Sequence, residues 1–444
     1  MASSHAIYVE SHNRELARIS LTRRIMRLFT CDACGHTVFF ENVRCTQCSH
    51  SLAYLPDVQR VSAIEPVKGD DTNLLYVALA QAAGGKQYRL CQNSIDYGVC
   101  NWAVPADDDN PLCECCRLND VIPDLTKPEN LSAWHQLEAG KRRLFRTLRA
   151  LQLPIESRAE RPTNGLVFSF KEDAPDGSEK VFTGHNDGEI TINIAEADDP
   201  FREKLRKQLG EGYRTVLGHF RHEIGHYFWD RLVKESVWIP ACRTLFGDET
   251  VDYQESVAHH YANPPPSDWP LHYVSSYATM HPWEDWAETW AHYLHMVDTL
   301  ETARGYGLVL RPKPVGAPAQ TALKARNIDF DDFDDLLQAW VPLTVALNSL
   351  NRSMGLIDPY PFVLSTDVIE KLRFVHDVIE HANAKPKLQE KAAAAWEKRL
   401  ADGVKSKVPD GTGDAESQIE TPASESDANA GKPAPEGAAS EATL

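Results

Sequence analysis

The sequence predicts an α+β fold in which a metal-stapled N-terminal part precedes a larger, mainly helical part with a small sheet. Three observations support this prediction. Nine of the ten cysteines lie between Cys31 and Cys116. From about residue 130 the apolar residues recur with helical periodicity. Within that part, 188–194 reads Gly-Glu-Ile-Thr-Ile-Asn-Ile, and the alternation of isoleucine with another residue indicates a half-buried strand.

Shifts in composition divide the chain into four segments. Residues 1–27 are a basic N-terminal arm, which we interpret as solvated rather than as a binding element. Its basic residues are Arg14, Arg18, Arg23, Arg24 and Arg27. Residues 28–125 hold the cysteine cluster, and 130–382 form the helical domain. Residues 383–444 begin as a charged, helix-like run and continue as an acidic tail, predicted to be disordered because it has little apolar surface to bury.

Charge and hydropathy exclude several classes of protein. A net charge of -18 and a pI near 5.4 disfavour general binding to nucleic acid or anionic lipid, because an acidic surface repels both. No stretch approaches the roughly 20 apolar residues that a membrane helix needs, and the N-terminus lacks the apolar core of a secretory signal. We therefore expect a cytoplasmic protein without membrane partners.

The first cysteine group has the spacing of a closed zinc site. Cys31-Asp-Ala-Cys34 and Cys45-Thr-Gln-Cys48 are two Cys-x-x-Cys knuckles, and together they present four thiolates to one tetrahedral ion. His36 and His50 are less suitable ligands because four thiolates already fill the tetrahedron. We predict a structural zinc here.

The second cysteine group is spaced more loosely. Only the pair Cys113 and Cys116 has knuckle spacing, which leaves Cys115 as a spare thiol. We predict a second structural zinc at Cys91, Cys100, Cys113 and Cys116, and the alternative is a set of free buried cysteines. Neither cysteine site leaves a coordination position for substrate, so the reactive centre must lie elsewhere.

A histidine pair in the helical domain is the candidate reactive centre. His222, Glu223 and His226 form a His-Glu-x-x-His motif, which places both imidazoles one turn apart on one helix face. One stripe of this helix is apolar, and a nearly opposite stripe is polar. The apolar stripe is Leu217, Phe220, Ile224 and Phe228, and the polar one is His219, His222, His226 and Asp230. The alternative is a buried structural histidine pair.

A third ligand is expected downstream, because two neutral imidazoles leave zinc with room for a carboxylate and a water molecule. Glu284 and Glu288 lie four residues apart in an aromatic segment. We assign Glu284 as the ligand and Glu288 as the acceptor of a ligating histidine's N–H, a role that Asp230 would fill for another ring nitrogen. The rival ligands are His292 and His295, and the alternative for the segment is a buried aromatic helix with solvated acids.

These motifs resemble known metallopeptidases. The first helix resembles that of the gluzincins, and Tyr277 to Glu288, Tyr-Ala-Thr-Met-His-Pro-Trp-Glu-Asp-Trp-Ala-Glu, is similar to the corresponding segment of anthrax lethal factor-type enzymes. That resemblance implies that Tyr277 assists at the reaction centre. One departure is the gap of 58 positions between His226 and Glu284, which is longer than in thermolysin-like gluzincins.

The wider arrangement resembles a bacterial family of zinc-binding metallopeptidases with an N-terminal zinc ribbon. The residues that carry this resemblance run from Met26-Arg-Leu-Phe-Thr-Cys31 through Cys100-Asn-Trp-Ala-Val-Pro105 to the histidine motif, and it covers about 26–380. It implies a zinc ribbon followed by a zincin-like metallopeptidase domain, and it indicates no particular substrate. The two cysteine groups themselves lead us to expect two small zinc-ribbon modules within 28–125.

The expected function is therefore peptide-bond hydrolysis with one catalytic and two structural zinc ions. Glu223 would be the general base, Tyr277 would donate to the oxyanion, and His219 would orient substrate or line the cleft. The strand at 188–194 would pair with an extended peptide or protein substrate.

The alternative function is a non-catalytic module in which the ribbons bind a protein partner and the protease domain is a degenerate scaffold. The intact Glu223 argues against it, because a site that only binds zinc needs no general base. A zinc-ribbon protein that binds nucleic acid is disfavoured by the acidic charge.

Overall fold

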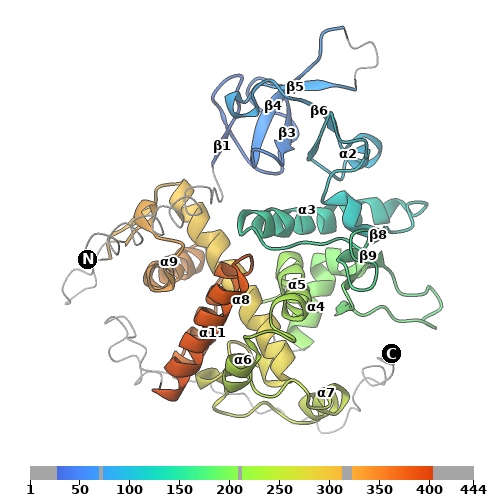
Figure 1. The fold of residues 1–444 in the computed structure, drawn as a ribbon. Helices are drawn as coiled ribbons and strands as arrows, with labels where there is room; N and C mark the ends of the chain where they lie inside the picture. Colours follow the sequence, from blue (N-terminus) through green and yellow to red (C-terminus); the bar gives the residue numbers. More distant parts are fainter. Residues whose placement is uncertain (1–27, 70–73, 209–212, 313–322, 404–444) are drawn as a thin grey trace, which may run out of the picture.

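The computed structural model describes residues 28–69, 74–208, 213–312 and 323–403. The basic arm and the acidic tail beyond 403 that the sequence predicts lie outside these residues. Within them the chain is α+β, with a cysteine-rich zinc-ribbon region followed by a mainly helical part that contains a small sheet (Figure 1). Every helix in the described part of the chain is too short or too polar to cross a lipid bilayer.

One five-stranded sheet connects the two cysteine groups. Two cysteines of the first group, Cys31 and Cys34, lie in the hairpin of β1 (Phe29–Thr30) and β2 (Thr37–Val38), and the other two, Cys45 and Cys48, follow β2. The sheet that follows has strands in sequence order, and they are β3 (Ser51–Leu55), β4 (Arg60–Pro66), β5 (Tyr76–Ala78), β6 (Gln87–Leu90) and β7 (Ala103–Pro105). The amide of Tyr54 in β3 donates to the carbonyl of Asn101 at 2.8 Å, so β3 also contacts the segment that leads into β7. The two cysteine groups therefore share one folded unit.

The long helix α3 (Pro128–Ala150) joins this unit to the helical part. Figure 1 shows it lying between the N-terminal strands and the helices below. On one side the ring of Phe145 packs 5.4 Å from that of Trp102. On the other side Gly140 faces Phe220, and a Cβ at Gly140 would lie 3.2 Å from that ring. The helix is thus buried from both sides.

A four-stranded sheet in the order β10-β11-β9-β8 backs the histidine helix. Its strands are β8 (Asn119–Val121), β9 (Val167–Lys171), β10 (Gly184–Asn186) and β11 (Glu189–Asn193). Ile190 and Ile192 are fully buried, which explains the alternation in the sequence. Strand β8 follows the last cysteines directly, so this sheet begins inside the segment assigned to the cysteine region.

The prediction that the isoleucine strand pairs with a peptide is wrong. This strand is β11, and its two edges are already occupied, by β9 in parallel and by β10 antiparallel. A strand with two neighbours has no free backbone groups for a third. The open edge beside the histidine helix is β10, which has β11 as its single strand neighbour in the described part of the chain.

The helical part is built around α8 (Pro282–Gly305), against which α5 (Val216–Leu232) packs. Gly225 allows close approach, because a Cβ there would lie 3.1 Å from the Cα of Ala287. The other α-helices are α2 (Gln92–Tyr97), α4 (Asp199–Gln208), α6 (Ile239–Phe246), α7 (Tyr253–Ala262), α9 (Phe333–Ser353), α10 (Thr366–Glu380) and α11 (Pro386–Ala401). The short elements are the hairpin of β12 (Val309–Leu310) and β13 (Leu323–Lys324), and the 3-10 turns η1 (Gln81–Ala83), η2 (Cys116–Leu118), η3 (Ile194–Ala197), η4 (Trp269–Leu271), η5 (Tyr277–Thr279) and η6 (Ala325–Asn327).

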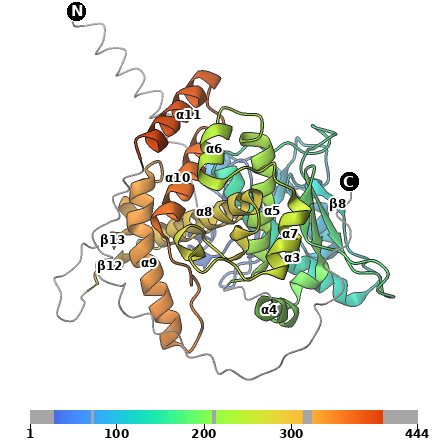
Figure 2. The same cartoon turned by 90° about the horizontal axis from the view of Figure 1, so that it is seen from below.

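The helix-like run expected after residue 382 is α11, and it packs on the helical part. Trp396 is 3% exposed, and its ring lies 5.4 Å from that of Phe374 on α10. Arg399 forms a two-pronged ion pair with the buried Glu370. Figure 2 shows α11 beside α6 and α10. The compact structure therefore extends through this helix rather than ending near 382.

Candidate metal centre

The histidine helix α5 is placed by its cap and its apolar stripe. Thr215 caps it, with its side-chain oxygen accepting from the amide of Gly218 at 3.0 Å. Phe220, Ile224 and Phe228 are completely buried, as the apolar stripe predicts, and Leu217 packs at the margin of the core. The opposite face therefore turns His222 and His226 toward α8.

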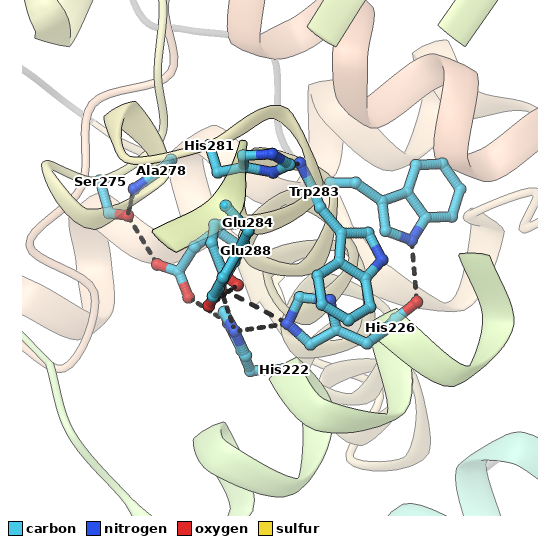
Figure 3. A network of polar contacts seen from close by, with 11 residues as sticks. His222, His226, Ser275, Ala278, His281, Trp283, Glu284 and Glu288 are labelled. Carbon is cyan, nitrogen blue, oxygen red and sulfur yellow. Dashed lines mark hydrogen bonds and ion pairs between the residues drawn. The ribbon is translucent and has the colours of Figure 1, made fainter. Parts of the chain in front are cut away.

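Helix α8 brings a carboxylate to the histidine pair. His281 caps its start, accepting from the amide of Trp283 at 3.0 Å, and Pro282 occupies the first turn. Glu284 then points at the histidines from this first turn, as Figure 3 shows. Its Oε2 lies 2.9 Å from Nε2 of His222 and 3.4 Å from Nε2 of His226.

The three groups form a pocket of metal-ligating atoms. The Nε2 atoms of His222 and His226 are 3.2 Å apart, and the ligand atoms of both histidines and Glu284 all lie within 4.8 Å of one another. Two imidazole nitrogens and a carboxylate oxygen that converge in this way fit a zinc ion with a fourth position left open. The geometry thus brings together the three residues that the sequence selected.

Glu288, one turn further along α8, contacts the far side of His222. The Nδ1–H of His222 donates to Oε1 of Glu288 at 2.7 Å, and the hydroxyl of Ser275 donates to Oε2 at 2.6 Å. Burial by itself raises the pKa of the Glu288 carboxyl. The hydrogen bond from His222 and the other favourable contacts outweigh burial, and together they lower this pKa to about 2. A ring that donates its Nδ1–H to Glu288 would present the lone pair of Nε2 to a metal ion.

The second histidine has no such partner. Among the described residues, the buried Nδ1 of His226 has no hydrogen-bond partner. Asp230 instead accepts from the ammonium group of Lys234 at 3.3 Å, so the structure does not bring Asp230 to a ligating histidine. The ring of His226 is held by packing, with the ring of Trp283 at 3.9 Å and that of His185 on β10 at 6.2 Å.

Glu223 lies beside the ligands without joining them. Its side chain is buried, and burial raises the pKa of its carboxyl above the ordinary value, opposed by the neighbouring charges of His222 and His226. A buried carboxyl with a raised pKa is a better proton acceptor than a solvated one.

Two tyrosines flank the centre. The ring of Tyr277, in η5, lies 5.8 Å from that of His222, and its hydroxyl makes no hydrogen bond within the described residues. Tyr253, the first residue of α7, donates its hydroxyl to Oε1 of Glu284 at 2.9 Å. Sequence reasoning missed Tyr253, since it lies 31 positions before Glu284 in a segment without any motif.

The remaining histidines lie outside the metal pocket. His219 sits 3.3 Å from the carboxylate of Glu196, which also pairs with Arg214 at 2.7 Å. His292 is bonded to the hydroxyl of Tyr360 at 3.0 Å. The ring of His295 packs on aromatic residues, with the ring of Tyr213 at 5.4 Å. The two rival ligands are therefore committed elsewhere.

Both cysteine groups have the geometry of closed metal sites. In each, the four sulfur atoms lie within 4.8 Å of one another, and the sets are Cys31, Cys34, Cys45 and Cys48, and Cys91, Cys100, Cys113 and Cys116. Cys115 is fully buried but belongs to neither set. All ten cysteines are free thiols rather than disulfides.

Comparisons with known proteins match both the cysteine-rich region and the helical part. A family model described as "Putative zinc-binding metallo-peptidase" matches residues 130–378, and a zinc-ribbon domain model matches residues 28–127. Similar proteins from Mycobacterium bovis and Mycobacterium tuberculosis, both described as uncharacterized, are 41% identical over 356 residues, which is 80% of this chain and 96% of theirs. No solved structure matches the chain.

Proposed function

The chain belongs to the zinc-binding metallo-peptidase family, and from this premise we propose that it is a zinc-dependent peptidase that hydrolyses peptide bonds. The observation that carries the proposal is the convergence of His222, His226 and Glu284 with Glu223 buried beside them. A closed structural site would use its fourth position for another protein ligand. This set has three protein ligands and an adjacent base, which is the composition of a catalytic site.

The metal and the protein have separate tasks in this proposal. A zinc ion held by the three ligands would acidify a water molecule and polarise the carbonyl of the scissile bond. Glu223 accepts the proton of the attacking water and delivers it to the leaving amine. Tyr277 donates its uncommitted hydroxyl to the carbonyl oxygen as negative charge develops there. His219, paired with Glu196, lines the approach one turn before His222.

We propose that the substrate is an extended peptide or protein segment that pairs with β10. Its support is the open edge of β10 together with the ring of His185, a residue of this strand that packs beside His226. Backbone pairing with a strand edge binds a peptide with little regard to its side chains. The zinc-ribbon region is then a candidate platform for a protein partner or for the substrate itself.

We propose a reducing compartment, the cytoplasm, because eight of the ten cysteines converge in two four-sulfur sets, and clustered cysteines hold metal rather than disulfides where the compartment is reducing. Cysteines of secreted proteins are more often joined in disulfides.

The test is cleavage of a diverse peptide library by the full chain, with the Glu223→Gln variant as control. The variant keeps all three proposed ligands, so it should retain its zinc while hydrolysis falls by on the order of a hundredfold or more. If the two proteins cleave equally, Glu223 is not the base. If neither cleaves any peptide, the chain is better described as a non-catalytic interaction module on a degenerate protease scaffold.

A further inference from the structure

We propose that Tyr253 is a positioning residue of the histidine centre, whose hydroxyl holds one oxygen of Glu284 so that the other faces His222 and His226. The inference rests on the proposed zinc centre and adds to it a residue from the segment between the two ligand helices. Nothing in the spacing of the motifs pointed to this residue.

The two oxygens of Glu284 have different contacts. Oε1 accepts the hydroxyl of Tyr253 at 2.9 Å, whereas Oε2 faces the Nε2 atoms of both histidines. The side chain is 3% exposed, so water cannot replace the tyrosine easily. With Oε1 engaged, Glu284 would offer a zinc ion a single oxygen, and a one-oxygen ligand would leave more room for water and substrate than a two-oxygen ligand.

The position of Tyr253 is tied to the start of α8. Its ring packs 5.2 Å from that of His281, the residue that caps α8. The Nε2 of His281 also bonds to the carbonyl of Val251 at 3.2 Å, two residues before the tyrosine. Asp252 caps α7 by accepting from the amide of Glu255 at 2.8 Å. The same residue, His281, therefore orients both the helix that carries Glu284 and the turn that carries Tyr253.

Tyr277 provides a matched comparison at the same centre. Both tyrosines lie close to Glu284 and Glu223, and burial raises the pKa of both hydroxyls. Only the hydroxyl of Tyr253 is bonded to a ligand, since that of Tyr277 has no bond within the described residues. Removing the hydroxyl of Tyr253 should therefore affect metal affinity, whereas removing that of Tyr277 should affect only the reaction with substrate.

The experiment compares zinc retention by the full-length wild type and the Tyr253→Phe, Tyr277→Phe and Glu284→Ala variants across a series of buffered free-zinc concentrations. The zinc content of Glu284→Ala defines the ions held by the cysteine sites alone. Tyr253→Phe should release the additional ion at about 10- to 100-fold higher free zinc than the wild type. Tyr277→Phe should release this ion at the same free-zinc concentration as the wild type. After treatment with a chelator, Tyr253→Phe should unfold at the same temperature as the chelator-treated wild type.

Three results would overturn the inference. The first is that Tyr253→Phe retains zinc as well as the wild type, and the second is that both tyrosine variants weaken zinc affinity equally. The third is that metal-free Tyr253→Phe unfolds at a lower temperature than the metal-free wild type, which would indicate a purely structural role. Zinc retention does not depend on cleavage. A wild type that holds the additional zinc but cleaves no peptide would therefore end the proposed peptidase function while leaving the role of Tyr253 intact.

Discussion

Glu284 and Glu288 stand one turn apart on α8 and contact different nitrogens of the same histidine. Glu284 faces Nε2 of His222, on the side of the metal pocket, and Glu288 accepts from Nδ1 on the other side. A carboxylate in the first position neutralises charge at the ion, whereas one in the second position orients the ring and keeps its proton on the outer nitrogen. Two residues of one type, four positions apart, thus contact opposite sides of one imidazole, and we propose separate roles for them.

This difference leads to a prediction for the two alanine variants. Glu284→Ala should lose the zinc of the histidine centre at concentrations where both cysteine sites stay filled, because a ligand is missing. Glu288→Ala should weaken affinity by only about 10- to 100-fold, because the ligands remain. Metal analysis of the full chain against buffered zinc measures both. Full affinity in Glu284→Ala, with loss in Glu288→Ala, His292→Ala or His295→Ala, would show that the ligand assignment is wrong.

Helix α3 and strand β8 are joined by a buried ionic cluster next to the second cysteine group. The ammonium group of Lys141 and the carboxylate of Glu138 are both fully buried and lie 2.8 Å apart. Lys141 also donates to the side-chain oxygen of Asn119 on β8, and the side-chain NH2 group of Asn119 donates to Glu138 at 2.7 Å. Burial opposes the charge on Lys141, but Glu138 and the nearby cysteines raise its pKa above the usual value. The cluster ties the helix to the edge of the four-stranded sheet.

Replacing Lys141 by methionine should lower the free energy of unfolding by about 3–5 kcal/mol, because Glu138 would remain as an uncompensated buried charge. Urea denaturation monitored by far-UV circular dichroism measures this decrease in the free energy of unfolding. The double variant Lys141→Met with Glu138→Leu should recover much of it, because both buried charges are then gone. A single variant as stable as the wild type would mean that the pair does not hold α3 to the sheet.

At the scale of the whole molecule, the cysteine region and the helical part are continuous. The last cysteines lead within three residues into β8, a strand of the sheet behind the histidine helix, and α3 packs on both parts. A chain that begins near residue 130 would lack β8 and leave an edge of β9 unpaired. Metal binding at the second cysteine group is therefore expected to stabilise the helical part as well as the cysteine region.

Three metal sites predict three zinc ions per chain. Two cysteine sets offer four thiolates each, and the histidine centre offers three ligands. Elemental analysis of protein purified without added metal should give three zinc ions per chain in the wild type and two in a His222→Ala variant. About one zinc ion per wild-type chain would exclude at least the second cysteine site.

The sequence by itself determined the local chemistry. Knuckle spacing selected six of the eight clustered thiols, and four-residue spacing selected the pair His222 and His226 and the pair Glu284 and Glu288, because ligands on one turn or one helix face are related by short, regular intervals. The resemblance to known metallopeptidases then favoured Glu284 over Glu288. Interactions between distant segments left no such pattern. Tertiary structure alone decided that β10 rather than β11 has the open edge, that Asp230 turns to Lys234, and that α11 docks on α10. It alone placed Tyr253 on Glu284, because which segments meet depends on packing of the whole chain rather than on any interval along it.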